Sequence, residues 1–242
     1  MEVINDLVGI NHLKIYQNDD WFKFSLESVL LPYFVTINLR SKSILDLCTG
    51  NAPVPLILST RTKAKIIGVE IQKDVALLAQ KSVQINHLEK QITILNEDIK
   101  NLKNYYCGDN FDVITVNPPY FKNSELSIKN IDEHKVIARH EVEISLEEII
   151  KISCYLLKNG GYLAMVHRTE RLMEVLKLMN KYHLVPKKMQ FIYPKDNSSS
   201  NLFMIECMKD GKEGLKILKP LFIHNDDGTY KEEIVKLFNK GV

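Results

Sequence analysis

The hydrophobic and polar positions from residue 43 onward alternate between short apolar runs and longer amphipathic stretches. The apolar runs are typical of buried strands. They occupy residues 43–48, 65–70, 92–95, 111–116, 161–166, 188–193 and 202–208. The stretches between them indicate helices over residues 54–59, 73–87, 145–157 and 170–183. Strands that alternate with helices predict an α/β domain with a doubly wound, largely parallel sheet.

The pattern changes near the end of the chain. Residues 188–193 and 202–208 both read as strands, and only a polar turn at residues 196–200 separates them. Neighbouring strands joined by a short turn pair antiparallel. We therefore expect a seven-stranded sheet that is largely parallel and ends in a C-terminal antiparallel pair.

Two capping boxes mark predicted helix starts. In this pattern a Ser or Thr is followed three residues later by Glu, and the two residues cap each other's backbone N–H groups. Ser145 and Glu148 open one such helix. Thr229 and Glu232 predict the start of a terminal helix that ends at Gly241.

The N-terminal segment lies outside the alternating pattern. Residues 13–16 and 21–24 look like strands on either side of the polar Asn18-Asp-Asp20, which predicts a hairpin, and a helix is expected from about Ser25. We expect residues 1–42 to form a lid of hairpin and helix, and residues 43–242 to form a single domain.

Composition and charge exclude several classes of protein. The 242 residues are 45% hydrophobic and 26% charged, an ordinary globular mixture that argues against disorder. No apolar stretch approaches the ~20 residues of a membrane span, and the N-terminus lacks a signal-peptide pattern. We therefore expect a cytoplasmic protein without a membrane partner, and favour a monomer. The net charge of +2 neither indicates nor excludes nucleic-acid binding. The four cysteines and the histidines lack metal-ligand spacing, so no metal site is expected.

Candidate chemistry begins with residues 46–51, Asp-Leu-Cys-Thr-Gly-Asn, where the first predicted strand ends. Open α/β sheets bind ligands at the carboxyl ends of their strands, and Gly50 lets the backbone approach a ligand closely. The turn holds one glycine, so it lacks the G-x-G-x-x-G pattern that cradles a dinucleotide pyrophosphate. A nicotinamide dehydrogenase is therefore disfavoured. Strand–turn–helix geometry alone, with Asn51 as a helix cap, is the simpler alternative.

Two further acids follow the next strands. Glu70 closes the second strand, and a carboxylate there can accept hydrogen bonds from both hydroxyls of a ribose. Asp98 follows the third strand and can accept from an adenine amino group, although it could equally cap a short helix. Together with Asp46, these acids describe a nucleoside lying across the sheet edge.

The sharpest signal is Asn117-Pro118-Pro119-Tyr120, directly after the fourth strand. Two prolines stiffen this loop at the predicted ligand edge. The Asn117 amide oxygen and the Pro118 carbonyl can both accept from one planar NH2 group, and Tyr120 can stack on a flat ring. A plain polar turn is the alternative.

These motifs resemble those of class I S-adenosylmethionine-dependent amino-group methyltransferases. Over nearly the whole chain the sequence is similar to the bacterial tRNA1(Val) adenine N6-methyltransferases, which modify adenosine 37 beside the anticodon. The similarity includes residues 7–31, 138–141 and 211–228. It implies a Rossmann-like fold, S-adenosylmethionine as cofactor and tRNA as partner. It also implies site roles: cofactor binding by Asp46, Thr49, Gly50, Asn51, Glu70, Asp98 and Asn117, and catalysis by Asn117, Pro118, Pro119 and Tyr120.

The chain departs from this family at three positions. Cys48 and Ala52 stand where glycine is usual, and Glu27 stands where the family usually carries Asp. Since a cysteine avoids left-handed backbone, we expect a negative φ at Cys48.

Substrate contacts are expected from Tyr120 and from basic side chains. Arg139 and His140 could touch phosphate, or brace the loop before them through internal ion pairs. Lys187 and Lys188 form a positive spot suited to an RNA backbone, or simply a solvated surface.

Three alternatives stay open. A protein-glutamine N5-methyltransferase uses the same four-residue loop, but that family has a separate helical N-terminal domain, whereas 42 residues precede the first core strand here. The second alternative is a methyltransferase that acts on amino groups of rRNA or DNA, although a DNA enzyme usually needs a target-recognition domain. An inactive cofactor- or RNA-binding module is the third. The altered glycines favour it and the intact loop 117–120 opposes it.

Overall fold

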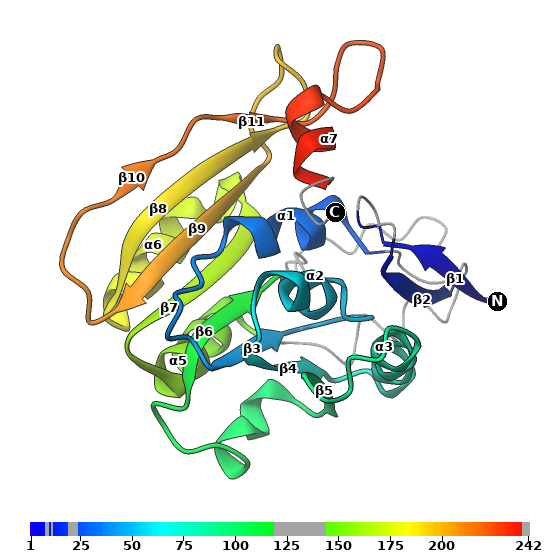
Figure 1. Cartoon of the computed structure of the whole chain (residues 1–242). Coiled ribbons are helices and arrows are strands. Elements are labelled where there is room, and N and C mark those ends of the chain that lie inside the picture. The colour runs from blue at the N-terminus through cyan, green and yellow to red at the C-terminus, as the bar shows by residue number, and fades with distance from the viewer. Residues whose placement is uncertain (8–9, 11, 19–23, 119–143, 239–242) are drawn as a thin grey trace, which may run out of the picture.

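A computed structural model gives the fold and describes residues 1–7, 10, 12–18, 24–118 and 144–238. Its centre is one twisted sheet of nine strands in the order β10-β8-β9-β7-β6-β3-β4-β5, with β11 also pairing with β8 (Figure 1). The long strands are β3 (Ser43–Leu47), β4 (Lys65–Glu70), β5 (Ile92–Asn96), β6 (Phe111–Val116), β7 (Leu157–Arg168), β8 (Leu184–Tyr193) and β9 (Leu202–Lys209). These are the predicted strands, and β9 runs antiparallel to both β7 and β8 as expected.

The two extra strands of the sheet are short. They are β10 (Lys216–Ile217) and β11 (Leu221–Phe222), which run parallel to β8. Two residues cannot show the alternation by which strands are recognised, so neither was predicted.

Helices cover both faces of the sheet, and the sheet separates the hydrophobic core into two clusters, one on each face. One face packs on α1 (Leu26–Phe34) and α2 (Pro53–Arg61), and the other on α5 (Leu146–Leu156) and α6 (Leu172–Lys181). Alternate residues of one strand enter opposite clusters, as Ile44 and Leu45 do in β3. Within the described residues, the remaining helices are α3 (Lys73–Ile85), α7 (Glu232–Phe238), and the 3-10 turns η1 (Ile99–Asn104) and η2 (Thr169–Arg171).

The N-terminal hairpin differs from the prediction. Its strands are β1 (Glu2–Asp6) and β2 (Lys14–Asn18), joined by a turn that Leu7 N–H closes onto the Leu13 carbonyl at 2.8 Å. The predicted strand at residues 13–16 corresponds to β2, which pairs with β1. Of the second predicted strand, residues 21–23 lie outside the described residues, and Phe24 is not in a strand. The mostly exposed polar sequence of β1 carries no strand signal.

The hairpin is fastened to α3, beside which it lies in Figure 1. The Tyr16 N–H donates to the Ser82 hydroxyl at 2.9 Å, and the Lys14 N–H donates to the Asn86 side chain at 2.9 Å. Leu7, Ile10 and Ile15 are fully buried in the same core cluster as α1 and α2. Residues 1–42 therefore share the core of the rest of the chain.

The two capping boxes had different outcomes. At Ser145 both reciprocal bonds are present, so this prediction is confirmed. At Thr229 the prediction is wrong: the hydroxyl donates to Asp227 at 2.6 Å, and α7 begins only at Glu232. Asp227 is two residues away and makes a local turn that competes with helix capping. Gly241, the predicted helix end, lies outside the described residues.

Candidate active site

The turn that follows β3 is built from left-handed backbone. Cys48, Gly50 and Ala52 have φ values of +55°, +57° and +73°. The prediction of a negative φ at Cys48 is therefore wrong. The turn must reverse the chain within a few residues, because Thr49 N–H is tied to the Val69 carbonyl at 2.9 Å and Ala52 N–H to the Thr49 carbonyl at 3.0 Å. Left-handed backbone costs about 1–2 kcal/mol in a residue with a Cβ, which explains why glycine suits these positions.

Gly50 sits where a ligand could approach the turn. A Cβ built at this glycine would meet no atom within 4 Å, so open space lies above the backbone. Gly68 of β4 is the opposite case, since its Cβ would come within 2.8 Å of the Thr49 hydroxyl. A side chain at residue 68 would push the turn away from the sheet.

Asp46 braces the turn from beneath. Its carboxylate is 1% exposed and accepts hydrogen bonds from the Thr49 and Thr115 hydroxyls, both at 2.6 Å. Burial raises the pKa of Asp46 to about 7, although both hydroxyls act in the opposite direction. The group therefore changes charge near neutral pH.

Glu70 faces the turn from the end of β4. One carboxylate oxygen accepts from the Gly50 N–H at 3.0 Å and the other from the Gln72 N–H at 3.0 Å. Burial raises the pKa of Glu70, and these N–H groups oppose the shift. The Ile71 N–H also acts on this carboxylate. A carboxylate has about four acceptor sites, so capacity remains for a further hydrogen bond. That capacity, beside the space above Gly50, fits a ribose hydroxyl of a nucleoside cofactor.

Two other predicted cofactor residues have structural partners. Asp98 caps η1 by accepting from the Lys100 N–H at 2.9 Å, which is the helix-cap alternative considered for it. The other oxygen of its partly exposed carboxylate lies 3.5 Å from the Lys100 ammonium. Asn51 donates to the Tyr16 carbonyl of β2 at 2.9 Å and so joins the hairpin to the turn.

Asn117 lies at the carboxyl end of β6 and is held by helix α1. Its side-chain nitrogen donates to the Ser28 hydroxyl at 2.9 Å and to the Ser25 hydroxyl at 3.3 Å. These two contacts hold the Asn117 side chain against the start of α1, with its amide nitrogen turned towards the serines. Pro118 is buried directly after it. Since β3 and β6 are adjacent and parallel, with Leu47 opposite Val116, Asn117 and the turn lie at one edge.

Of the other predicted residues the structure describes only Lys187 and Lys188, and neither lies at this edge. Pro119, Tyr120, Arg139 and His140 lie outside the described residues. Lys187 is near the beginning of β8 and donates to the Lys212 carbonyl at 2.8 Å. The Lys188 ammonium lies 3.2 Å from buried Glu206 and 2.8 Å from the Thr36 hydroxyl, so it is engaged inside the fold.

Sequence analysis missed the residues that support Asn117 and Asp46. Ser25, Ser28 and Thr115 hold Asn117 and Asp46, yet each is a common residue in an ordinary helix or strand. Their roles depend on contacts between distant parts of the chain. The spacing of Ser25 and Ser28, which puts both on one helix face, is the single local hint.

No group of three or more potential metal ligands occurs among the residues that the structure describes. Within the same residues, no helix has the length and apolarity needed to cross a membrane.

Comparison with known proteins decides the family. The family model described as "Conserved hypothetical protein 95" matches residues 25–164, more than half of the chain. The chain belongs to this family. The matched region runs from the N-cap of α1 through β6 and into β7, and so contains the turn, Glu70 and Asn117.

Curated relatives are similar over most of the chain. A tRNA1(Val) (adenine(37)-N6)-methyltransferase of Bacteroides thetaiotaomicron is 27% identical over 96% of this chain and 89% of its own length. One of the same name from Shewanella halifaxensis is 28% identical over 71% of this chain and 69% of its own.

Solved structures show the same fold. A predicted O-methyltransferase from Agrobacterium tumefaciens matches with a TM-score of 0.69 and 18% identity, over 88% of this chain and 95% of its own. The geranyl diphosphate C-methyltransferase of Streptomyces coelicolor, solved with S-adenosyl-L-homocysteine, matches with a TM-score of 0.58 and 10% identity, over 76% of each chain. The predicted Rossmann-like class I methyltransferase fold is therefore confirmed.

Proposed function

We propose that this protein is an S-adenosylmethionine-dependent methyltransferase that methylates N6 of an adenine in tRNA, at adenosine 37 of tRNA1(Val) in keeping with its curated relatives. The observation that carries the proposal is the position of Asn117. The amide that would orient an amino group lies at the same sheet edge as Gly50 and Glu70, which fit a nucleoside cofactor. A tRNA substrate would place the reaction in the cytoplasm.

The residues suggest how the cofactor would be held. Glu70 would accept from a ribose hydroxyl, and the backbone at Gly50 would lie against the cofactor. Asp98 has carboxylate capacity for the adenine amino group. Asp46 would act indirectly, by holding Thr49 and so the shape of the turn. When bound, S-adenosylmethionine supplies a methyl group carried on a positively charged sulfur.

The reaction needs orientation of the nucleophile. The amino nitrogen of adenine is conjugated with its ring, so its lone pair is a poor nucleophile. The Asn117 side-chain oxygen and the Pro118 carbonyl would accept its two hydrogens, which turns the lone pair out of the ring plane. No base is needed to remove a proton first, since the nitrogen releases it after it has become positively charged. Catalysis would rest on positioning and preorganised acceptors.

Ser25 and Ser28 complete this arrangement. The two hydroxyls hold the Asn117 side chain at two points and so fix its position at the carboxyl end of β6. Helix α1 would thus set the acceptor on β6. Tyr120, predicted to stack on the target base, is part of the proposal on sequence grounds.

The test is incubation of the protein with labelled S-adenosylmethionine and each of total tRNA, an anticodon stem-loop and duplex DNA, followed by nucleoside analysis. We expect N6-methyladenosine in tRNA and none in duplex DNA, because an unpaired loop base is reached without melting a duplex. Absence of N6-methyladenosine from tRNA would contradict the proposal. Methylated glutamine in a protein substrate would instead support a protein-glutamine N5-methyltransferase.

A further inference from the structure

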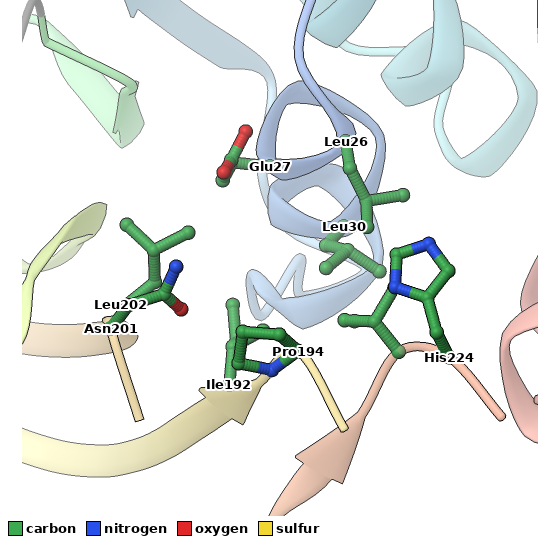
Figure 2. Close-up of a pocket in the computed structure, with 9 residues that line it drawn as sticks. Leu26, Glu27, Leu30, Ile192, Pro194, Asn201, Leu202 and His224 are labelled. Carbon is green, nitrogen blue, oxygen red and sulfur yellow. The ribbon is translucent and has the colours of Figure 1, made fainter. Parts of the chain in front are cut away.

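A small pocket lies beside the candidate active site, between the first turns of α1 and the carboxyl end of β8 (Figure 2). Its volume is about 160 Å³. Apolar side chains form most of its walls, among them Leu26, Leu30, Ile192 and Pro194. Three polar side chains, Glu27, Asn201 and His224, complete the lining.

In the part of the chain that the structure describes, the polar side chains that line the pocket lack hydrogen-bond partners in the protein, which distinguishes the pocket from an ordinary packing defect. Among the described residues, the carboxylate of Glu27, the amide of Asn201 and the imidazole nitrogens of His224 have no protein hydrogen-bond partner. Glu27 and His224 are nevertheless only partly exposed. The His224 ring stacks on Tyr230, with centroids 5.0 Å apart, which holds its plane in place. A ligand that enters the pocket could therefore bond to these groups without displacing a protein partner.

The pocket and Asn117 share one segment of the chain, the start of α1. Ser25 and Ser28 bond to the Asn117 amide, and Leu26 and Glu27, which lie between them in the sequence, line the pocket. Leu202, at the start of β9, pairs with Ile192 and with Arg168 at the end of β7, so this region belongs to the same sheet edge. It is two to three strands from β6, roughly 10–15 Å at normal strand spacing.

We propose that this pocket binds an unpaired nucleobase next to the methylated adenine, with the Glu27 carboxylate accepting from its exocyclic amino group. This rests on the proposed function, since it assumes an RNA substrate. Apolar walls suit the faces of a base, and Asn201 offers both a donor and an acceptor to its edge. The charge of Glu27 repels phosphate, which argues against a backbone contact.

The pocket therefore discriminates between bases. Adenine, cytosine and guanine carry an exocyclic amino group that Glu27 can bind, whereas uracil offers only its ring N3–H, which stands between two carbonyl oxygens that the carboxylate repels. A hydrogen bond to a charged group is worth about tenfold or more in binding. The expected preference at one flanking position is about tenfold in kcat/KM for a base with an amino group over uracil.

The experiment uses anticodon stem-loops that carry each of the four bases on either side of the target adenine. The wild-type protein, Glu27→Ala and the control Glu89→Ala are compared. Glu89 is exposed and lies just before β5, at the opposite edge of the sheet. The wild type and the control should discriminate against uracil at one flank about tenfold. Glu27→Ala should methylate all four stem-loops within about twofold of one another, with S-adenosylmethionine binding and thermal unfolding unchanged.

The outcomes separate the two proposals. Methylation by the wild type with the same base preference in Glu27→Ala would overturn the pocket assignment and leave the proposed function standing. Absence of methylation of any tRNA by the wild type would overturn the proposed function and the assignment with it. As a second probe, Asn201→Trp should obstruct the pocket from its exposed rim and lower kcat/KM for the preferred stem-loop about tenfold, and an unchanged value would also overturn the assignment.

Discussion

Glu70 is the residue on which the cofactor site depends most. Its carboxylate already holds the Gly50 and Gln72 N–H groups and has acceptor capacity left for a ribose. Glu70→Ala should weaken S-adenosylmethionine binding by roughly 1.5–3 kcal/mol, the range for hydrogen bonds to a charged group. Isothermal calorimetry measures this, with Glu89→Ala as the matched control on the opposite edge. Unchanged affinity in a folded Glu70→Ala protein would remove Glu70 from the ribose site.

Asp46 predicts how stability depends on pH. In the unfolded chain an Asp has a pKa of about 3.9, whereas burial raises the pKa of folded Asp46 to about 7. Between these values the folded state binds a proton that the unfolded state does not, so stability falls as pH rises from about 4 to 7. Asp46→Asn removes this titration but keeps groups that can bond to both threonines.

The measurement is urea unfolding of the wild type and Asp46→Asn between pH 5 and 7.5. The variant should gain about 2 kcal/mol relative to the wild type across this range. The wild type must be compared with the variant at each pH, because His167 changes the stability of both proteins with pH in the opposite direction. Burial lowers its pKa to about 4, so its contribution is present above an unfolded pKa of about 6.5 and is lost as pH falls towards 4. A difference between the two proteins that does not change with pH would contradict the assignment.

At the scale of elements, the turn between β3 and α2 shows where prediction from sequence succeeded and where it failed. Its position at the ligand edge followed from the alternation of strands and helices. The left-handed backbone at Cys48 and Ala52 did not follow, because neither residue prefers it. It is imposed by the Thr49 N–H, which donates to the Val69 carbonyl of the neighbouring strand, and by the Thr49 hydroxyl, which donates to Asp46. The first of these bonds depends on the assembled sheet.

The strain in this turn is testable with a pair of substitutions. Ala52→Gly should leave the free energy of unfolding unchanged or raise it by up to about 1 kcal/mol, because glycine adopts a positive φ without penalty. The control Ala79→Gly, also at a fully buried alanine but inside α3, should cost about 1 kcal/mol or more. Chemical denaturation measures both. An equal loss in the two variants would mean that the turn at Ala52 carries no strain.

The other elements follow the same logic. Strands β3 to β9 were predictable because burial on both faces gives long apolar runs. Strand β1 was not, since its mostly exposed side chains carry no pattern, and the start of α7 was misplaced because Thr229 bonds locally to Asp227. Within the site, Glu70 and Asn117 were predictable from their place after strands. Ser25 and Ser28 were not, because their partner is distant in the sequence.

At the scale of the whole molecule, the N-terminal segment joins the two halves of the candidate site. The hairpin reaches the turn through the Tyr16 carbonyl and Asn51, while α1 reaches β6 through Ser28 and Asn117. Residues 1–42 thus contact both the proposed cofactor region and the proposed acceptor of the amino group. The pocket beside α1 extends this edge towards β8.

The central claim is that this edge orients an adenine amino group for methyl transfer, and Asn117→Ala tests it most directly. The measurement is single-turnover methyl transfer to tRNA from S-adenosylmethionine with a deuterated methyl group, at saturating cofactor. The wild type should yield deuterated N6-methyladenosine. The variant should bind cofactor within a few-fold of the wild type but transfer the methyl group about 100-fold more slowly, as expected for loss of one preorganised partner of the transition state. Equal rates in the two proteins, or label on another atom of the tRNA, would contradict the account.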